Sequence, residues 1–239
     1  MRTIGLIGGM SWESTATYYR LVNQGIRDRL GPLRSAELLL ASVDFGPIEA
    51  DMRAGAWDAV GARMADAARR LEAGGAECIV LCTNTIHCVA PAIASGSALP
   101  LLHIGDAAGD GARHAGLRTV GLLGTGFTMR EPFLKDHLAR HFGLRVLVPD
   151  EQRQAQLHAI IFEELCAGIL REPSRAAFRE AMAALVAMGA EGILLACTEI
   201  GLLVQPGDAT VPLLDTTALH AAQAVAFALA EGPAMGQLS

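Results

Sequence analysis

The 239-residue chain is 51% hydrophobic and 18% charged, and its formal net charge is −6. This acidic balance, without any basic cluster, argues against a nucleic-acid partner and against binding to an anionic membrane. No apolar run reaches the roughly 18 residues that cross a bilayer, so we expect no membrane partner.

The five cysteines, Cys78, Cys82, Cys88, Cys166 and Cys197, are an odd number in a chain that opens on a strand pattern rather than a signal peptide. This combination favours reduced thiols and a cytoplasmic location. Their spacing lacks the paired CxxC pattern of a zinc site, so we expect no metal. The single lysine, Lys135, lies in a pattern typical of a solvated helix. A pyridoxal phosphate enzyme needs a lysine for its Schiff base, and we therefore expect no cofactor.

In chain order, the first half contains a strand over 3–7, a helix over 57–73, a buried strand over 75–81 and a short strand over 100–103. The second half has a strand over 119–123, helices over 154–170 and 174–188, strands over 189–195 and 212–215, and a closing helix over 215–230. The three strand motifs recur at offsets of 116, 114 and 112 residues. Matches in the same order at a nearly constant offset indicate two copies of one unit.

Strands that alternate with helices predict an α/β fold with a parallel sheet in each copy. We expect two similar parallel-sheet α/β domains related by a pseudo-twofold axis, with the active site in the cleft between them. The first domain is predicted to comprise residues 1–104 together with the C-terminal helix 216–239, and the second to comprise residues 105–215.

Polar residues follow the third strand of each copy, as Cys-Thr-Asn-Thr-x-His at 82–87 and as Cys-Thr-Glu at 197–199. In open α/β folds, ligands bind at the carboxyl ends of the strands. Helix starts at these positions favour a carboxylate ligand, and we expect them to lower the pKa of a nearby thiol. A carboxylate held between two opposed acid/base groups suits removal of a proton from one face of a carbon and its return to the other face.

The motifs at 82–87 and 194–199 resemble the two signatures of the aspartate/glutamate racemase family, and the segments 8–19 and 121–129 are similar to the same family. The resemblance covers almost the whole chain. It implies cofactor-independent racemisation of an amino acid in a two-domain α/β fold, two cysteines as base and acid, and a homodimer. Glutamate racemase normally has histidine after the second Cys-Thr pair. Glu199 stands there in this chain, which favours an aspartate or mixed aspartate/glutamate branch.

The second acid/base group is either Thr83 or Cys82. At the 114-residue offset, Cys197 falls opposite Thr83, whereas Cys82 falls opposite Ala196. Strand alternation then points Cys82 away from the cleft. We favour a Thr83/Cys197 pair, although a one-residue bulge at Cys82 would reverse the assignment. The chain most resembles an L-specific aspartate/glutamate branch of the family that has a similar threonine/cysteine site.

The remaining site candidates follow the first and third strands of the two copies and are predicted to contact the substrate. They are Met10, Ser11, Asn84, Thr85, Thr125, Thr128, Thr198 and Glu199. Plain helix capping and turn chemistry are the alternative explanations for most of them.

We expect a cofactor-independent racemase that acts on aspartate, glutamate or both by removing and returning the α-proton with two bases. Two alternatives remain open. One is a related cleft enzyme of the hydantoin racemase, maleate isomerase or arylmalonate decarboxylase type, and the other is a non-catalytic amino-acid-binding protein.

Overall fold

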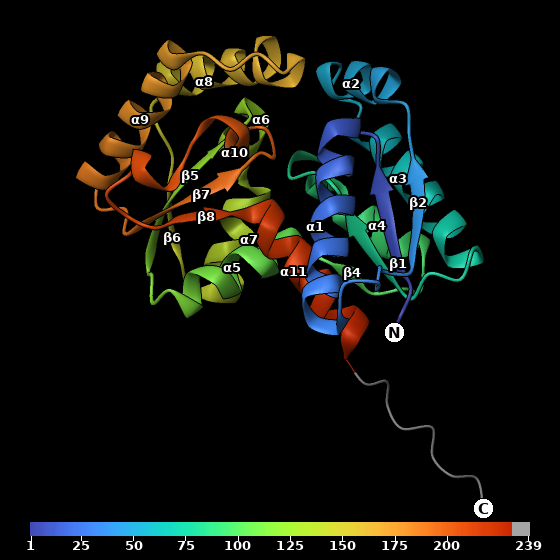
Figure 1. Cartoon of the computed structure of the whole chain (residues 1–239). Coiled ribbons are helices and arrows are strands. Elements are labelled where there is room, and N and C mark those ends of the chain that lie inside the picture. Colours follow the sequence, from blue (N-terminus) through green and yellow to red (C-terminus); the bar gives the residue numbers. More distant parts are fainter. Residues whose placement is uncertain (231–239) are drawn as a thin grey trace, which may run out of the picture.

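The computed structural model describes residues 1–230, and its strands form two separate parallel sheets of four strands each (Figure 1). The first sheet has the order β2-β1-β3-β4, and its strands are β1 (Ile4–Gly8), β2 (Leu38–Ser42), β3 (Cys78–Leu81) and β4 (Leu101–Leu102). The second has the order β6-β5-β7-β8, and its strands are β5 (Thr119–Gly124), β6 (Arg145–Leu147), β7 (Gly192–Ala196) and β8 (Leu213–Asp215). The identical topology of the two sheets confirms the predicted duplication.

Helices cover both faces of each sheet. In the first half they are α1 (Trp12–Leu30), α2 (Phe45–Arg53), α3 (Trp57–Ala73), the 3-10 helix η1 (Thr85–Val89) and α4 (Ala90–Gly96). The remaining helices are α5 (Ile104–His114), α6 (Gly126–Arg130), α7 (Pro132–Phe142), α8 (Glu151–Glu163), η2 (Leu165–Ala167), α9 (Glu172–Ala187), α10 (Ile200–Leu203), η3 (Pro206–Asp208) and α11 (Thr216–Leu229). Within residues 1–230, no helix combines the length and the apolar character that a membrane crossing requires.

The strand register makes the ends of β3 and β7 directly comparable. Gly124 at the end of β5 pairs with Ala196, while Ile7 pairs with Leu81, so that Gly8 stands beside the position of Cys82. Cys82 extends this ladder, since its N–H donates to the Ile7 carbonyl at 2.9 Å. Cys82 therefore corresponds to Ala196, and the next residue, Thr83, corresponds to Cys197.

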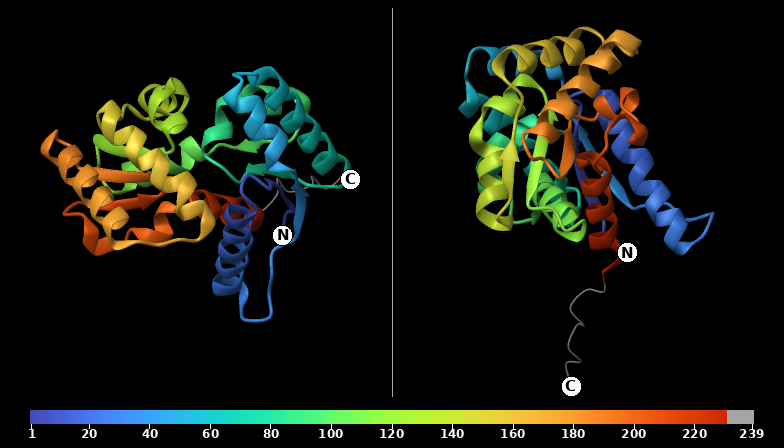
Figure 2. Two further views of the ribbon diagram at one scale, coloured as in Figure 1. Left: turned by 90° about the horizontal axis from the view of Figure 1, so that it is seen from above. Right: turned by 90° about the vertical axis from the view of Figure 1, so that its left-hand side faces the viewer.

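The helices that follow β4 and β8 are exchanged between the two halves. The α5 residues Ala108 and Ala112 pack with Leu122 and Leu194 of the second sheet. On α11, Ala224 and Val225 pack instead with residues of β1, β3 and α1, and Figure 2 shows this red helix reaching the other half of the molecule. This exchange supports the proposed domain division into 1–104 with 216–239 and 105–215, of which residues 231–239 lie outside the described residues.

Two of the predicted helices have boundaries that differ from those expected. The helix predicted over 154–170 begins earlier and ends at Glu163, where η2 and the left-handed Gly168 turn the chain. The helix predicted to start at Ser174 starts at Glu172, because Pro173 lies in the first turn, where a missing N–H costs nothing. The closing helix begins as expected, with the Asp215 side chain accepting from the Thr217 N–H at 2.8 Å.

Candidate active site

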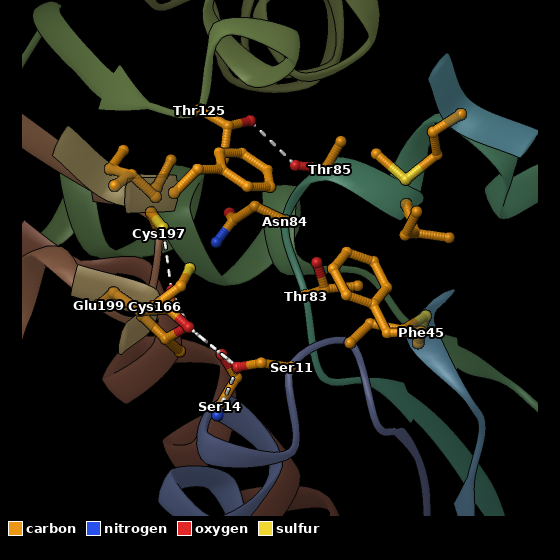
Figure 3. A pocket seen from close by; sticks show the side chains of 17 residues that line it. Ser11, Ser14, Phe45, Thr83, Asn84, Thr85, Thr125, Cys166, Cys197 and Glu199 are labelled. Atoms are coloured by element: carbon orange, nitrogen blue, oxygen red, sulfur yellow. Dashed lines mark hydrogen bonds between the residues drawn. The ribbon is translucent and has the colours of Figure 1, made fainter. Parts of the chain in front are cut away.

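A pocket lies between the carboxyl ends of the two sheets and is lined from both halves of the chain. Its lining residues are Met10, Ser11, Ser14, Phe45, Met52, Thr83, Asn84, Thr85, Ile86, Thr125, Ile161, Phe162, Cys166, Ala196, Cys197, Thr198 and Glu199. Figure 3 shows Cys197 and Glu199 on one side of this pocket and Thr83 and Phe45 on the other. The described fold thus brings together every sequence-predicted site residue except Cys82 and Thr128.

The carboxylate of Glu199 accepts hydrogen bonds from four side chains. The Cys197 thiol donates to Oε2 at 3.0 Å, and the Thr198 hydroxyl donates to the same oxygen at 2.8 Å. From the start of α1, the hydroxyls of Ser11 and Ser14 donate to Oε1 at 3.0 and 2.9 Å. These bonds join the signature of the second half to the first helix of the chain (Figure 3).

This network determines the charge on the thiol and the carboxylate. Burial raises the pKa of Glu199, but the hydrogen bonds from Cys197, Thr198 and Ser14 outweigh it and leave that pKa below its usual value. Burial, followed by the charge of Glu199, raises the pKa of Cys197 well above its usual value. The expectation that a helix start lowers the thiol pKa is therefore wrong. The α10 helix has only four residues, and an anion lies against the sulfur.

Cys82 and Thr83 follow β3 and face opposite ways. Cys82 is fully buried among apolar residues of β1, β3, α1 and α11, and it does not line the pocket. Burial raises the pKa of its thiol well above the usual value. Thr83 is half-buried in the pocket wall, and its backbone carbonyl accepts from Nδ1 of the buried His87 at 2.7 Å. Only the threonine side of this strand end can meet a ligand in the pocket.

Three threonine hydroxyls connect the two halves of the chain at one wall of the pocket. Thr85 lies 3.1 Å from both Thr125 and Thr128, measured between hydroxyl oxygens, and these two threonines are 3.2 Å apart. Thr128 is fully buried behind the lining, so it holds Thr85 and Thr125 and does not contact the pocket. On the neighbouring wall, the Thr216 hydroxyl donates to Asn84 Oδ1 at 3.2 Å.

Several lining residues were missed by the sequence reasoning. Ser14 had a readable signal, because it stands three residues after the N-cap Ser11, and its N–H donates to the Ser11 hydroxyl at 3.2 Å. Cys166 lies in η2, after α8, and the sequence gives it no mark beyond its being one of the five cysteines. Phe45, Met52 and Phe162 come from helices that pack over the pocket from each side, and nothing local distinguishes them from core residues.

Lys135 does not form part of the pocket lining. The Lys135 ammonium donates to the carbonyls of Met129 and Arg130, at 2.9 Å each. Among residues 1–230, the group of side chains with metal-ligand geometry is His103, Asp106 and His137, and it lies outside the pocket lining.

The fold and the pocket define a two-domain α/β protein with a polar, thiol-containing cleft. The Asp/Glu/Hydantoin racemase family model matches residues 7–224, and the chain belongs to this family. It is 46% identical to a protein from Yersinia pestis whose assignment as an Asp/Glu racemase is provisional, with a TM-score of 0.91 over 96% of this chain and 100% of that chain.

An aspartate racemase homologue from Pyrococcus horikoshii is 32% identical, with a TM-score of 0.84 over 95% of this chain and 99% of that one. Glutamate racemase from Francisella tularensis shares the fold at 14% identity, with a TM-score of 0.64 over 95% of this chain and 80% of that one. The protein is accordingly a racemase of this superfamily.

Proposed function

We propose that the protein is a cofactor-independent amino-acid racemase that acts on aspartate, glutamate or both. Cys197 is the acid/base group on one face of the substrate, and Thr83 is its counterpart on the other. The observation that carries this proposal is that Thr83 and Cys197 follow equivalent strands at equivalent register positions and line the same pocket from opposite sides.

The resting site holds a protonated thiol beside an ionised carboxylate, as the directions of the two pKa shifts require. A neutral thiol is a poor base, so Cys197 must first lose its proton to act on the L isomer. Glu199 Oε2 lies 3.0 Å from the sulfur and is the acceptor for that proton. The thiolate then takes the α-proton, which restores the thiol.

The carbanion takes its new proton from the opposite face. Thr83 supplies it, either from its hydroxyl or from a water molecule held by that hydroxyl. Solvent replaces this proton, and Glu199 returns its own proton to solvent, so the site regains its starting charges after each turnover. In the reverse direction, Thr83 or its water removes the proton, and Cys197 donates.

The polar side chains that surround Thr83 and Cys197 suit the α-carboxylate and ammonium groups of an amino acid. Asn84, Thr85, Thr125 and Thr198 line the pocket close to these two groups. The side chains of Asn84, Thr85 and Thr125 are neutral hydrogen-bond donors, and donors of this kind stabilise the extra negative charge of a deprotonated α-carbon. Ser11 and Met10 complete the wall from the first strand of the chain.

The test is racemisation in D2O without added cofactor. L-aspartate and L-glutamate are incubated separately with the purified protein. The enantiomers are then separated, and their molecular masses are measured by mass spectrometry. We expect the D product to carry one deuterium at Cα while the early remaining L substrate stays unlabelled. Absence of a D isomer from both substrates, or activity that returns only with pyridoxal phosphate, refutes the proposal.

A homodimeric assembly and a cytoplasmic location belong to this proposal as well. Both are inferred from the family resemblance and from the cysteine usage of the chain. Light scattering on the purified full chain tests the dimer directly.

A further inference from the structure

Five of the seven histidines gather outside the pocket, between η1, β4, α5, α7 and α11. Neighbouring rings have centroid separations of 4.7 Å for His87–His103, 4.1 Å for His103–His137, 4.5 Å for His137–His141 and 5.7 Å for His87–His220. We call these five residues the histidine cluster. None of them lines the pocket assigned to the amino acid.

Two members of the cluster have both ring nitrogens engaged. His87 donates from Nδ1 to the Thr83 carbonyl and accepts at Nε2 from the Ile104 N–H at 3.2 Å. His220 donates from Nε2 to the Leu102 carbonyl at 2.7 Å and accepts at Nδ1 from the Tyr18 hydroxyl at 2.9 Å. These two rings are fully buried structural links, which leaves His103, His137 and His141 for other chemistry.

We propose that His103, Asp106 and His137 form a binding site for a divalent cation of the zinc type, with His141 available as a fourth ligand. One ligand atom from each of the first three lies within 4.8 Å of the others. Two imidazoles and a carboxylate are a recognised zinc ligand set, with bonds of about 2.0–2.2 Å. Small movements of the three side chains would bring their ligand atoms to these distances from one ion.

The local backbone makes room for these rings. Position 105 is glycine, and a Cβ atom there would lie 2.6 Å from His137 Cδ2 and 2.9 Å from His103 Nδ1. Without that atom, the rings of His103 and His137 stack with an interplanar angle of 11°. His137 and His141 are four residues apart on α7, the helical spacing at which two imidazoles face one ion.

The site is open to solvent and carries negative charge. All three ligand residues are partly exposed, and a surface groove reaches His137 and His141 past Glu131 and Asp136. Arg140 also lines this groove and pairs with Asp136 at 2.9 Å. An ion can therefore enter without opening the fold.

Binding exchanges two existing hydrogen bonds for coordination. His137 Nε2 lies 2.7 Å from Asp106 Oδ1, and the ion takes the place of the proton between them, which leaves for solvent or moves to Nδ1. His103 is the N-cap of α5, and its Nδ1 accepts from the Gly105 N–H at 3.0 Å. Coordination by either His103 nitrogen removes this cap, because the ring then lacks a free lone pair at Nδ1. The ion is thus held less tightly than in a preformed structural zinc site.

The test is equilibrium dialysis of the full-length protein against Zn²⁺, with metal measured by mass spectrometry. We expect one bound equivalent, and a roughly tenfold or greater loss of affinity in His137→Ala and Asp106→Asn. His103→Asn removes one metal ligand but keeps a good N-cap residue at the start of α5. A loss of Zn²⁺ affinity in this variant therefore does not arise from unfolding of the helix. Thermal melting of each variant without metal checks that it is folded.

The matched controls are His114→Ala and Cys88→Ser. His114 is an exposed histidine on α5, the helix that carries Asp106, and Cys88 is a thiol in the groove that reaches His137 and His141. Both should bind Zn²⁺ as the parent protein does, and the parent's Co²⁺ complex should lack a thiolate charge-transfer band. The proposal is overturned if binding does not saturate. It is equally overturned if folded His137→Ala and Asp106→Asn keep the parent affinity, or if binding disappears in Cys88→Ser.

Discussion

The ends of β3 and β7 occupy equivalent places in the two halves, yet their chemistry differs. At the end of β7, Cys197 donates to Glu199, a carboxylate whose pKa is lowered by hydrogen bonds from Cys197, Thr198 and Ser14. At the end of β3, the pocket-facing residue is Thr83, and no acidic or basic side chain of the first half lines the pocket beside it. The duplicated framework therefore carries a base that can be activated on one side only.

A repeated fold therefore need not give two equal acid/base groups. A thiol beside a carboxylate can be converted to a base near neutral pH, whereas an isolated hydroxyl is a far weaker acid. Since two enantiomers are equally stable in water, kcat/KM must be equal for them whatever the site contains. The asymmetry must be sought in kcat and KM separately, and in the exchange of the α-proton with solvent.

Substitution of Cys197 should have the largest effect. Cys197→Ser removes the group that acts on the L face, and we expect kcat to fall by about 10³-fold or more, since a serine hydroxyl is a much poorer base. Chiral chromatography of aspartate and glutamate reactions measures the loss. A folded variant that keeps more than a tenth of the parent activity would remove Cys197 from the mechanism.

Glu199→Gln should have the next largest effect, because it keeps an acceptor oxygen and removes the charge. We expect kcat to fall on the order of 10–10²-fold. The parent rate should be nearly flat through neutral pH, as the lowered pKa of Glu199 keeps it ionised there. The variant rate should rise with pH into the alkaline range, because burial still raises the thiol pKa and no base assists its ionisation. Parallel pH profiles would contradict this role.

Thr83→Ala tests the acid/base group on the opposite face of the substrate. We expect racemisation to fall by about 10²-fold, while Cys197 continues to remove the α-proton on its own face, to exchange it for a solvent proton through Glu199 and to return the solvent proton. In D2O the variant should therefore label the remaining L substrate without inverting it. Thr83→Cys is the matched variant, and it should recover racemisation by placing a thiol on each side of the substrate. Equal loss of exchange and racemisation in Thr83→Ala would argue against separate roles.

Cys82→Ala should have the smallest effect. Its side chain packs in the apolar core against α1 and α11, so the loss of one buried sulfur should lower the free energy of unfolding by about 1 kcal/mol. A protein of this size should then melt roughly 2–4 °C lower, which calorimetry measures. Racemisation should be unchanged within twofold. An inactive but folded Cys82→Ala protein would make Cys82, rather than Thr83, the second acid/base group.

The repeat was readable from the sequence alone because each copy carries its pattern locally. Buried parallel strands give continuous apolar runs, and the glycine turns and polar residues that follow them stand at fixed positions. From these marks, the 114-residue offset placed Thr83 opposite Cys197, and the strand register of the folded chain has the same correspondence. The helix over 57–73 was also predicted with its observed bounds, since its apolar spacing is regular.

The charges of the site residues depend on contacts that form only in the folded chain. Glu199 meets Ser11 and Ser14 across 188 and 185 residues of chain. The hydrogen bond from Ser14 joins those from Cys197 and Thr198 in lowering the Glu199 pKa against the effect of burial. The histidine cluster likewise joins residues from both halves, and no local spacing links His103 to His137. Local patterns report strand and helix periodicity, whereas a pKa depends on every charge, donor and buried surface that the fold brings within a few ångströms.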